Sequence, residues 1–167
     1  MDLSMSPISR RRLTATLSVA ALGMLLQPAV VLADTAAEIK AEIVNTNAYT
    51  RKNLKDMDTG ISSKGSLQFW SSGGLVQEVA ADAPVASYES FSLTPKHIQV
   101  VVLEEGKSAV AMYYAEGSFH EKGNQPVAHY MTRITEVYVN EGGKWKTRAA
   151  HYSPIAAGSG TNQTAID

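Results

Sequence analysis

Two glutamates and a histidine on β-patterned segments are the side chains of this sequence best suited to acid–base chemistry. Glu116 lies in segment 109–119, Glu136 lies in segment 127–139, and His151 lies near the end of the last such segment. A carboxyl group held in an apolar cavity has a raised pKa and can act as a general base or acid near neutral pH. We therefore take these three residues as candidate catalytic residues.

The alternation of side chains along each strand decides whether the two glutamates meet. Glu116 shares one face of its segment with Tyr114, and Glu136 shares one face of its segment with Tyr130. If both faces line one cavity, the two carboxylates converge there beside tyrosine hydroxyls. The ligand pocket expected on this basis comprises Trp70, Met112, Tyr114, Glu116, Tyr130, Glu136 and His151.

A structural interpretation of the same residues stays open, because a one-residue slip in register moves every side chain to the other face. In that interpretation Glu136 pairs across strands with Arg148, and Glu116 lies on the solvent face opposite a lysine or arginine. Such pairs contribute only about 0.2–1 kcal/mol each. His151 has the same two interpretations, since a single histidine near a strand end is often a hydrogen-bonded structural residue.

The composition excludes several other chemistries. The chain has no cysteine, which excludes thiol catalysis, iron–sulfur clusters and thiolate zinc sites. Its four histidines do not pair at metal-ligand spacing on a helix, so we expect no metal and no cofactor. No Gly-x-Ser-x-Gly elbow is present, and the glycine-rich segment 69–75 lacks the Lys-Ser/Thr of a phosphate-binding loop. The aspartates of a steroid isomerase have no clear counterparts, since Asp82 lies in a turn and Asp56 and Asp58 lie at a helix end.

Residues 1–33 have the pattern of an export signal. A basic segment at 10–12 precedes an apolar run at 13–26, and Val-Leu-Ala at 31–33 suits signal peptidase, so we expect a mature chain beginning at Asp34. The expected location is periplasmic or secreted. An uncleaved membrane anchor is the alternative. Ser9 to Leu13 also resembles a twin-arginine signal, and the ordinary secretory route stays equally open.

The charge of the mature chain is mildly acidic. Three of the 15 basic and one of the 16 acidic residues lie in 1–33, which leaves 12 and 15 and a net charge of −3. A net charge of this sign provides no positively charged surface for binding nucleic acid. After cleavage of the signal we also expect no stable membrane insertion.

The remaining sequence predicts one helix followed by strands. A helix to about Asp56 is expected, with Asp34-Thr35 as N-cap, Glu38 in the capping-box position three residues after Thr35, and an apolar stripe. The stripe consists of Ala37, Ala41, Val44 and Ala48, widened by Ile39, Ile43 and Leu54. Strands are expected at 66–70, 74–79, 86–93, 98–103, 109–119, 127–139 and 144–154, with a break at Pro95-Lys96. Residues 34–155 then form one domain, followed by a mobile tail at 156–167.

A long helix followed by a strongly bent sheet predicts an α+β fold, in which about six antiparallel strands curl around the helix as a cone. Several segments resemble the SnoaL-like branch of the nuclear transport factor 2 superfold, which is also described as cystatin-like. They are Tyr113 to Gly117, Thr135 to Tyr138, Gly143 to Trp145 and His151 to Ser153. Within that branch they are most similar to the association domain of calcium/calmodulin-dependent kinase II and its bacterial relatives, over roughly residues 36–155.

The resemblance implies a pocket between helix and sheet, and a homodimer packed through the sheets. Met131 and Val137 are the apolar outer positions expected at that dimer surface. In the kinase association domain, the positions that match Glu116 and Glu136 look to be arginines, so an anionic ligand does not carry over. The resemblance does not decide function, because members of the fold have many activities.

Two function classes stay open. The first is a non-catalytic exported domain that binds a small apolar or mixed-polarity molecule or drives oligomerisation. The second is a cofactor-free lyase, isomerase or cyclase, with Glu116 or Glu136 as base and a tyrosine or His151 as proton donor.

Overall fold

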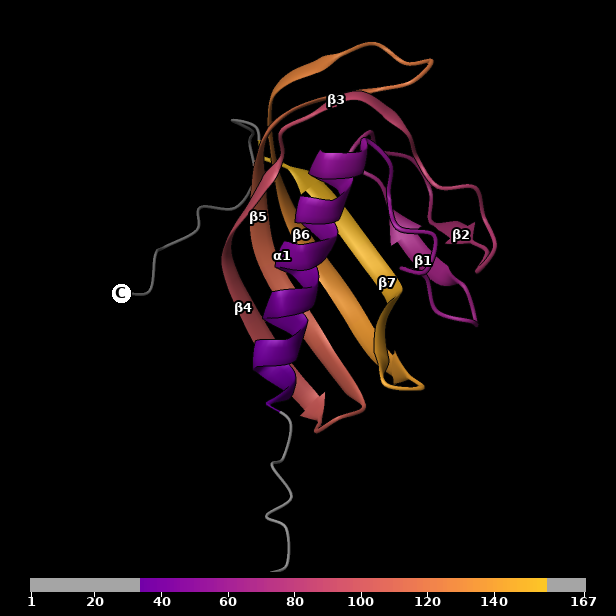
Figure 1. The fold of residues 1–167 in the computed structure, drawn as a ribbon, viewed down its shortest axis with the longest axis vertical. Coiled ribbons are helices and arrows are strands. Elements are labelled where there is room, and N and C mark those ends of the chain that lie inside the picture. Colours follow the sequence, from indigo (N-terminus) through magenta and orange to yellow (C-terminus); the bar gives the residue numbers. More distant parts are fainter. Residues whose placement is uncertain (1–33, 156–167) are drawn as a thin grey trace, which may run out of the picture. The chain divides into compact units, whose positions relative to one another are not determined.

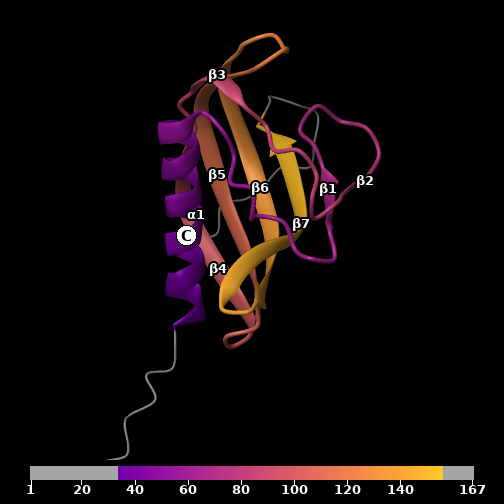
Figure 2. The same ribbon diagram turned by 45° about the vertical axis from the view of Figure 1, so that its right-hand side comes forward.

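The computed structural model describes residues 34–155, which form one helix and seven strands. In chain order these are α1 (Thr35–Asn53), β1 (Ser66–Phe69), β2 (Gln77–Val79), β3 (Tyr88–Phe91), β4 (Thr94–Glu104), β5 (Ser108–Glu121), β6 (Val127–Glu141) and β7 (Lys144–Pro154). Figure 1 shows α1 lying across one face of the sheet, and Figure 2 shows the helix and the sheet as two separate layers. No helix in this part of the chain is long and apolar enough to cross a membrane.

The seven strands form one mixed, unclosed sheet. Its order is β2-β1-β7-β6-β5-β3, and β4 pairs with β5 beside β3. The β1–β7 pair is parallel, and the other pairs are antiparallel. Register shifts interrupt the β3–β5, β4–β5, β5–β6 and β6–β7 pairs, which lets long strands bend. We call the face that α1 covers the concave face, and the opposite one the outer face.

Local capping explains where α1 begins and ends. Asp34 is the N-cap, and its carboxylate accepts a hydrogen bond from the Ala37 backbone N–H at 3.1 Å. Leu54 closes the helix in the left-handed conformation, with its N–H donating to the Thr50 carbonyl at 2.8 Å. The helix therefore ends three residues before the predicted Asp56.

The predicted capping box and apolar stripe of α1 are wrong in detail. Thr35 is fully buried and its hydroxyl donates to Glu105 Oε2 at 2.6 Å, so it serves the β4–β5 turn instead of the helix end. The stripe from Ala37 to Ala48 is largely exposed, with Val44 51% exposed, whereas Ile39 and Ile43 are buried. The helix thus covers the sheet with its isoleucines and leaves the alanine–valine flank uncovered.

The core lies between α1 and the middle of the sheet. It is formed by Ile39, Ile43, Ala109, Ala111, Tyr138 and Trp145. Alanines at the two β5 positions let the helix approach the sheet closely, while Trp145 fills the space toward β7. The Trp145 indole N–H donates to Glu38 Oε2 at 2.9 Å, so this large ring is buried with its polar atom satisfied.

The predicted strands are confirmed as elements, with one correction at β4. That strand begins at Thr94 and runs through Pro95 and Lys96, where a break was predicted. Proline is tolerated because β4 lies at the edge of the sheet, where a missing N–H costs no ladder bond on the open side. The adjacent His97 has a φ of 54°, which marks the bulge between Lys96 and Gln99.

Gly117 is required by the close approach of β5 to the connection between β3 and β4. Its φ is 145°, and a Cβ at this position would lie 2.4 Å from the Ser92 carbonyl oxygen. We expect Gly117→Ala to lower the free energy of unfolding by roughly 2–4 kcal/mol, because both strain and a backbone clash oppose the methyl group. Denaturant unfolding of the purified variant measures this loss.

Gly123→Ala is the matched control. Gly123 has a φ of 83°, and a Cβ there would meet no atom within 4 Å. The control therefore carries the left-handed strain without the clash, and we expect a loss of only about 1–2 kcal/mol. Equal losses in the two variants would remove the close approach as the explanation.

Candidate functional site

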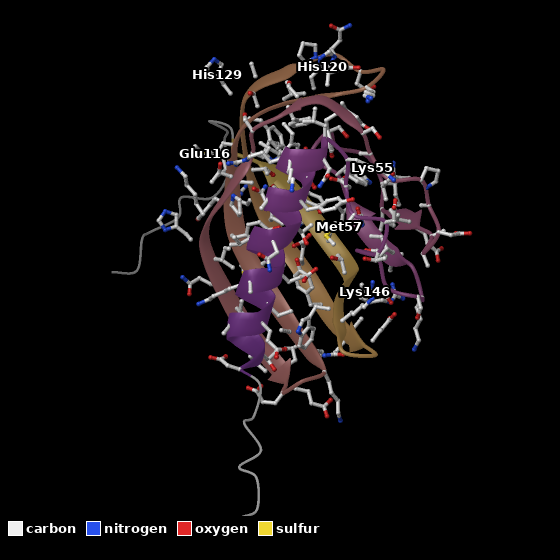
Figure 3. The ribbon with its side chains drawn as sticks, viewed as in Figure 1. Lys55, Met57, Glu116, His120, His129 and Lys146 are labelled. Carbon is white, nitrogen blue, oxygen red and sulfur yellow. The ribbon has the colours of Figure 1, made fainter. Side chains whose placement is uncertain are left out.

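The register of β5 against β6 separates the two predicted glutamates. Glu136 lies opposite Ala111 on the concave face and is only 7% exposed. Glu116 lies opposite Met131 on the outer face, where its carboxylate contacts the ammonium group of Lys96. The predicted convergence of the two carboxylates is therefore wrong, because even-numbered residues of β6 lie opposite odd-numbered residues of β5. Figure 3 shows Glu116 at the margin of the sheet, with His129 above it.

The other predicted pocket residues divide between the two faces. Met112 and Tyr114 share the outer face with Glu116, and His151 lies there against the ring of Phe69, with ring centroids 5.5 Å apart. Trp70 and Tyr130 lie on the concave side with Glu136. The seven residues of the predicted pocket thus do not form one site.

Glu136 is the centre of a hydrogen-bonded group that we call the acid–tyrosine cluster: Glu136, Tyr113, Tyr138 and Tyr152. Glu136 Oε2 accepts hydrogen bonds from the Tyr113 hydroxyl at 2.8 Å and the Tyr138 hydroxyl at 2.7 Å. Oε1 accepts from the Tyr152 hydroxyl at 3.2 Å. The donors come from β5, β6 and β7, so one carboxyl group joins three neighbouring strands.

Burial makes this carboxyl group harder to ionise. Desolvation raises the pKa of Glu136 above its ordinary value of 4.5, and the bonds from Tyr138, Tyr113 and Tyr152 oppose part of that rise. Burial and the charge of Glu136 hold the pKa of each tyrosine well above 10. The tyrosines are therefore neutral donors at physiological pH, and Glu136 is the group of the cluster that can exchange a proton.

A second buried acid lies beyond the end of α1. Asp56 accepts hydrogen bonds from the Tyr88 hydroxyl at 3.0 Å and the Thr50 hydroxyl at 3.1 Å. Burial raises the pKa of Asp56 above its ordinary value of 3.8. The charge of Asp56 also raises the pKa of Tyr152, so two acids act on one phenol. The concave face therefore carries two carboxyl groups, the predicted Glu136 and, in place of Glu116, Asp56.

The sequence argument missed Tyr113, Tyr152, Tyr88 and Asp56. Tyr138 lies two residues after Glu136, so alternation places the two on one face of the strand. Tyr113 could be added only with the register of the neighbouring strand, which aligns Ala111 with Glu136. Asp56 and Tyr88 carry no comparable local signal. They meet because the backbone N–H of Tyr88 donates to the Leu54 carbonyl at 2.8 Å, a contact between distant segments.

Aromatic side chains cover the concave face next to Tyr152. The Trp70 ring stacks on Tyr152 with centroids 5.6 Å apart and an interplanar angle of 16°, and it is 44% exposed. The Tyr130 hydroxyl donates to Ser71 Oγ at 2.5 Å, which ties the segment after β1 to β6. A molecule that approaches Tyr152 from this side meets Trp70 first.

The two clearest hollows of the described residues lie away from the acid–tyrosine cluster. One, of about 910 Å³, is an open hollow near the bends of β4, β5 and β6, and its lining includes Lys96, Glu116 and His129. The other, of about 420 Å³, lies between α1 and the start of β4, and we call it the α1–β4 groove. Its lining is Val44, Asn47, Ala48, Arg51, Lys52, Thr94 and Pro95.

The outer face carries an exposed apolar patch. We call it the outer patch; its members are Leu67, Phe69, Val101, Leu103, Met112, Tyr114 and Met131. Each of these side chains is 41–61% exposed, and they come from β1, β4, β5 and β6. Polar and charged residues lie between these side chains, since Met112 lies opposite Gln99 and Thr135, Tyr114 opposite Lys96 and Arg133, and Met131 opposite Glu116.

The buried acid predicts a characteristic pH dependence of stability. Because the folded-state pKa of Glu136 is raised, its contribution is fully present below about pH 4.5 and is lost as the pH rises through the folded-state pKa. Glu136→Gln cannot ionise. We therefore expect its melting temperature, relative to the wild type, to increase as the pH rises from 4.5 through the folded-state pKa of Glu136 and to level off above that pKa.

Glu116→Gln is the control for this measurement, because its side chain is 39% exposed and solvated beside Lys96. We expect its difference from the wild type to stay flat over the same range. Parallel curves for Glu136→Gln and the wild type would show that Glu136 does not carry the pH dependence.

Comparison with protein families and with curated proteins found no match. Among solved structures, the chain is similar to a protein from Exiguobacterium sibiricum provisionally assigned as a calcium/calmodulin-dependent kinase II association domain. The two share 17% identity over 73% of this chain and 94% of that one, with a TM-score of 0.54.

Two further similar structures superpose less well. An NTF2-like protein from Cytophaga hutchinsonii has 14% identity over 71% of this chain and 91% of its own, with a TM-score of 0.44. A protein from Shewanella frigidimarina, provisionally assigned as a ketosteroid isomerase, has 20% identity over 72% and 96%, with a TM-score of 0.41.

The Exiguobacterium structure, together with one helix laid over a curved, unclosed sheet, confirms the predicted fold class. The chain therefore has the nuclear transport factor 2-like α+β fold.

Proposed function

We propose that this chain is an exported self-associating domain, in which two copies pair through the outer patch. The observation that carries the proposal is the exposure of seven large apolar side chains on one face of the sheet. Single exposed apolar side chains are common on soluble monomers, but seven large ones on one sheet face favour burial against another subunit, where polar neighbours can also find partners. A two-fold axis places the same patch on both copies, so each copy covers the other.

Two further points support association. Burial of apolar surface contributes roughly 25 cal/mol per Å², and the long side chains of Met112, Met131 and Leu103 have much area left to bury. The Exiguobacterium protein of the same fold bears the description of an association domain. Met131 and Val137, the outer positions expected from the sequence, lie on this face.

Acid–base chemistry on a small molecule is the second candidate function, and the acid–tyrosine cluster is the observation that favours it. Glu136 has a raised pKa, which suits a general base or acid, and three phenols surround it as hydrogen-bond donors. A substrate of mixed polarity would first meet and stack on the exposed Trp70 ring. It would reach Tyr152 only once the Trp70 ring had moved off the tyrosine. His151 plays no part in this proposal, because it lies on the outer face against Phe69.

Substitution of Met112 in the outer patch, or of Val137 on the same face of the sheet, tests self-association. We expect Met112→Glu, and likewise Val137→Glu, to raise the dissociation constant of the pair by at least about tenfold, because a charge would be buried without a partner. Light scattering across a concentration series gives the mass. Leu75→Glu is the control, since Leu75 is 88% exposed outside the patch.

The control should keep the wild-type mass. A wild-type protein that is monomeric at micromolar concentration would contradict the proposal, and so would an unchanged mass in both patch variants.

Native mass spectrometry of the protein purified from its own host tests export and ligand binding together. We expect a polypeptide mass that begins at Asp34, as the export signal in 1–33 predicts. On the second candidate function, the wild type also carries a bound small molecule that Glu136→Gln fails to retain. An intact Met1 in a membrane fraction would contradict cleavage, and a ligand held equally by both chains would remove Glu136 from the site.

A further inference from the structure

The strand β4 has one unpaired edge. Within residues 34–155 it pairs only with β5, and Figure 1 shows it at the margin of the sheet. Its stretch 98–103, Ile-Gln-Val-Val-Val-Leu, has no charged residue and no proline. Natural sheets protect such edges with charges, prolines or bulges, since unpaired N–H and C=O groups recruit another strand. Here Pro95, Lys96 and the bulge at His97 protect only the beginning of the strand.

The helix leaves an apolar flank beside this edge. Val44 is 51% exposed, and it lines the α1–β4 groove together with Ala48. Arg51 fixes this end of the helix to the start of β4, because its guanidinium donates to the Leu93 carbonyl at 2.7 Å and to the Thr94 hydroxyl at 2.8 Å. The open edge and the open flank thus form one continuous surface.

The charges along this surface change sign from one end of β4 to the other. Arg51 and Lys52 lie at the beginning of the strand beside Lys96, which pairs with Glu116, and Glu105 lies at its end beside Glu104, which pairs with Lys107. Two copies that meet antiparallel about Val100 place the basic end of each strand against the acidic end of the other. The surface is therefore complementary in charge to itself.

We propose that a second copy of this chain adds its β4 antiparallel to this edge, so that one sheet continues through both copies. The two helices then lie on the same side of the joint sheet, with Val44 and Ala48 of each against the partner's flank. The pairing is isologous and leaves no open β4 edge. A peptide from another protein would need its own charges arranged to complement those along β4.

This edge interface goes beyond the proposed function and is separate from the outer patch. The outer patch pairs sheets face to face, whereas the edge pairs them side by side. A chain with both interfaces assembles beyond two copies. If the outer patch does not mediate association, the β4 edge still gives a dimer. An experiment can therefore contradict either proposal without contradicting the other.

Mass measurements on a set of four chains distinguish the interfaces. We expect the wild-type assembly to have a mass greater than that of two copies. Val44→Glu and Met112→Glu should each reduce the mass to that of two copies, and the double variant should be monomeric. Asn45→Glu is the matched control on α1, since Asn45 is exposed but does not line the groove. Unchanged assembly in Val44→Glu, with or without Met112→Glu, overturns the edge interface.

A charge swap tests the antiparallel direction in the Met112→Glu background. Lys52→Glu alone and Glu105→Lys alone should each raise the dissociation constant on the order of tenfold, because like charges then face each other. The double swap Lys52→Glu with Glu105→Lys should restore the original value. Failure of the double swap to recover affinity overturns the proposed pairing about Val100.

Cross-linking gives an independent measurement, because the chain has no cysteine of its own. Val100→Cys places a thiol at the two-fold axis, and we expect a disulfide-linked dimer under mild oxidation. Asn124→Cys, in the exposed β5–β6 turn, reports random collision. A cross-linking yield no higher than that of the control overturns the proposal, provided that the variant melts cooperatively; otherwise the charge swap decides it.

Discussion

The antiparallel register between β5 and β6 determines which side chains the helix covers and which the solvent reaches. With Glu136 opposite Ala111, small residues of β5 lie under α1 and the tyrosines close around one carboxyl group. The same register turns Glu116 and Met112 to the outer face. A slip of one residue would expose the core and bury Glu116 with Met112, so the helix packing, the buried acid and the outer patch all depend on this single alignment.

A carboxyl group on the concave face is costly, and the chain compensates with hydrogen bonds. Three neutral phenols donate hydrogen bonds to the Glu136 carboxyl group. Within the described residues, no buried side-chain polar atom lacks a hydrogen-bond partner. This network links β5, β6 and β7 through hydrogen bonds to one carboxyl group. It also leaves an acid that is protonated more easily than a surface glutamate, which is the property that acid–base chemistry needs.

The sheet does not close, and the two surfaces that we propose for self-association follow from that. A closed barrel has no edge strand, whereas this curved sheet ends at β4 on one side and β2 on the other. One helix can cover only part of the concave face and none of the outer face. Apolar side chains therefore remain on the outer patch and along the β4 edge, where further copies of the chain can cover them.

Local sequence patterns determined the order of elements, the α+β class and the residues that share a face within each strand. These depend on neighbours a few positions apart, which is why Tyr130 and Glu136 were grouped correctly. Only the tertiary structure decided which face meets the helix, because strand register and helix rotation depend on pairings between distant residues. For that reason only Ile39 and Ile43 of the predicted apolar stripe entered the core, Glu116 lay outside, and Asp56 joined the concave face.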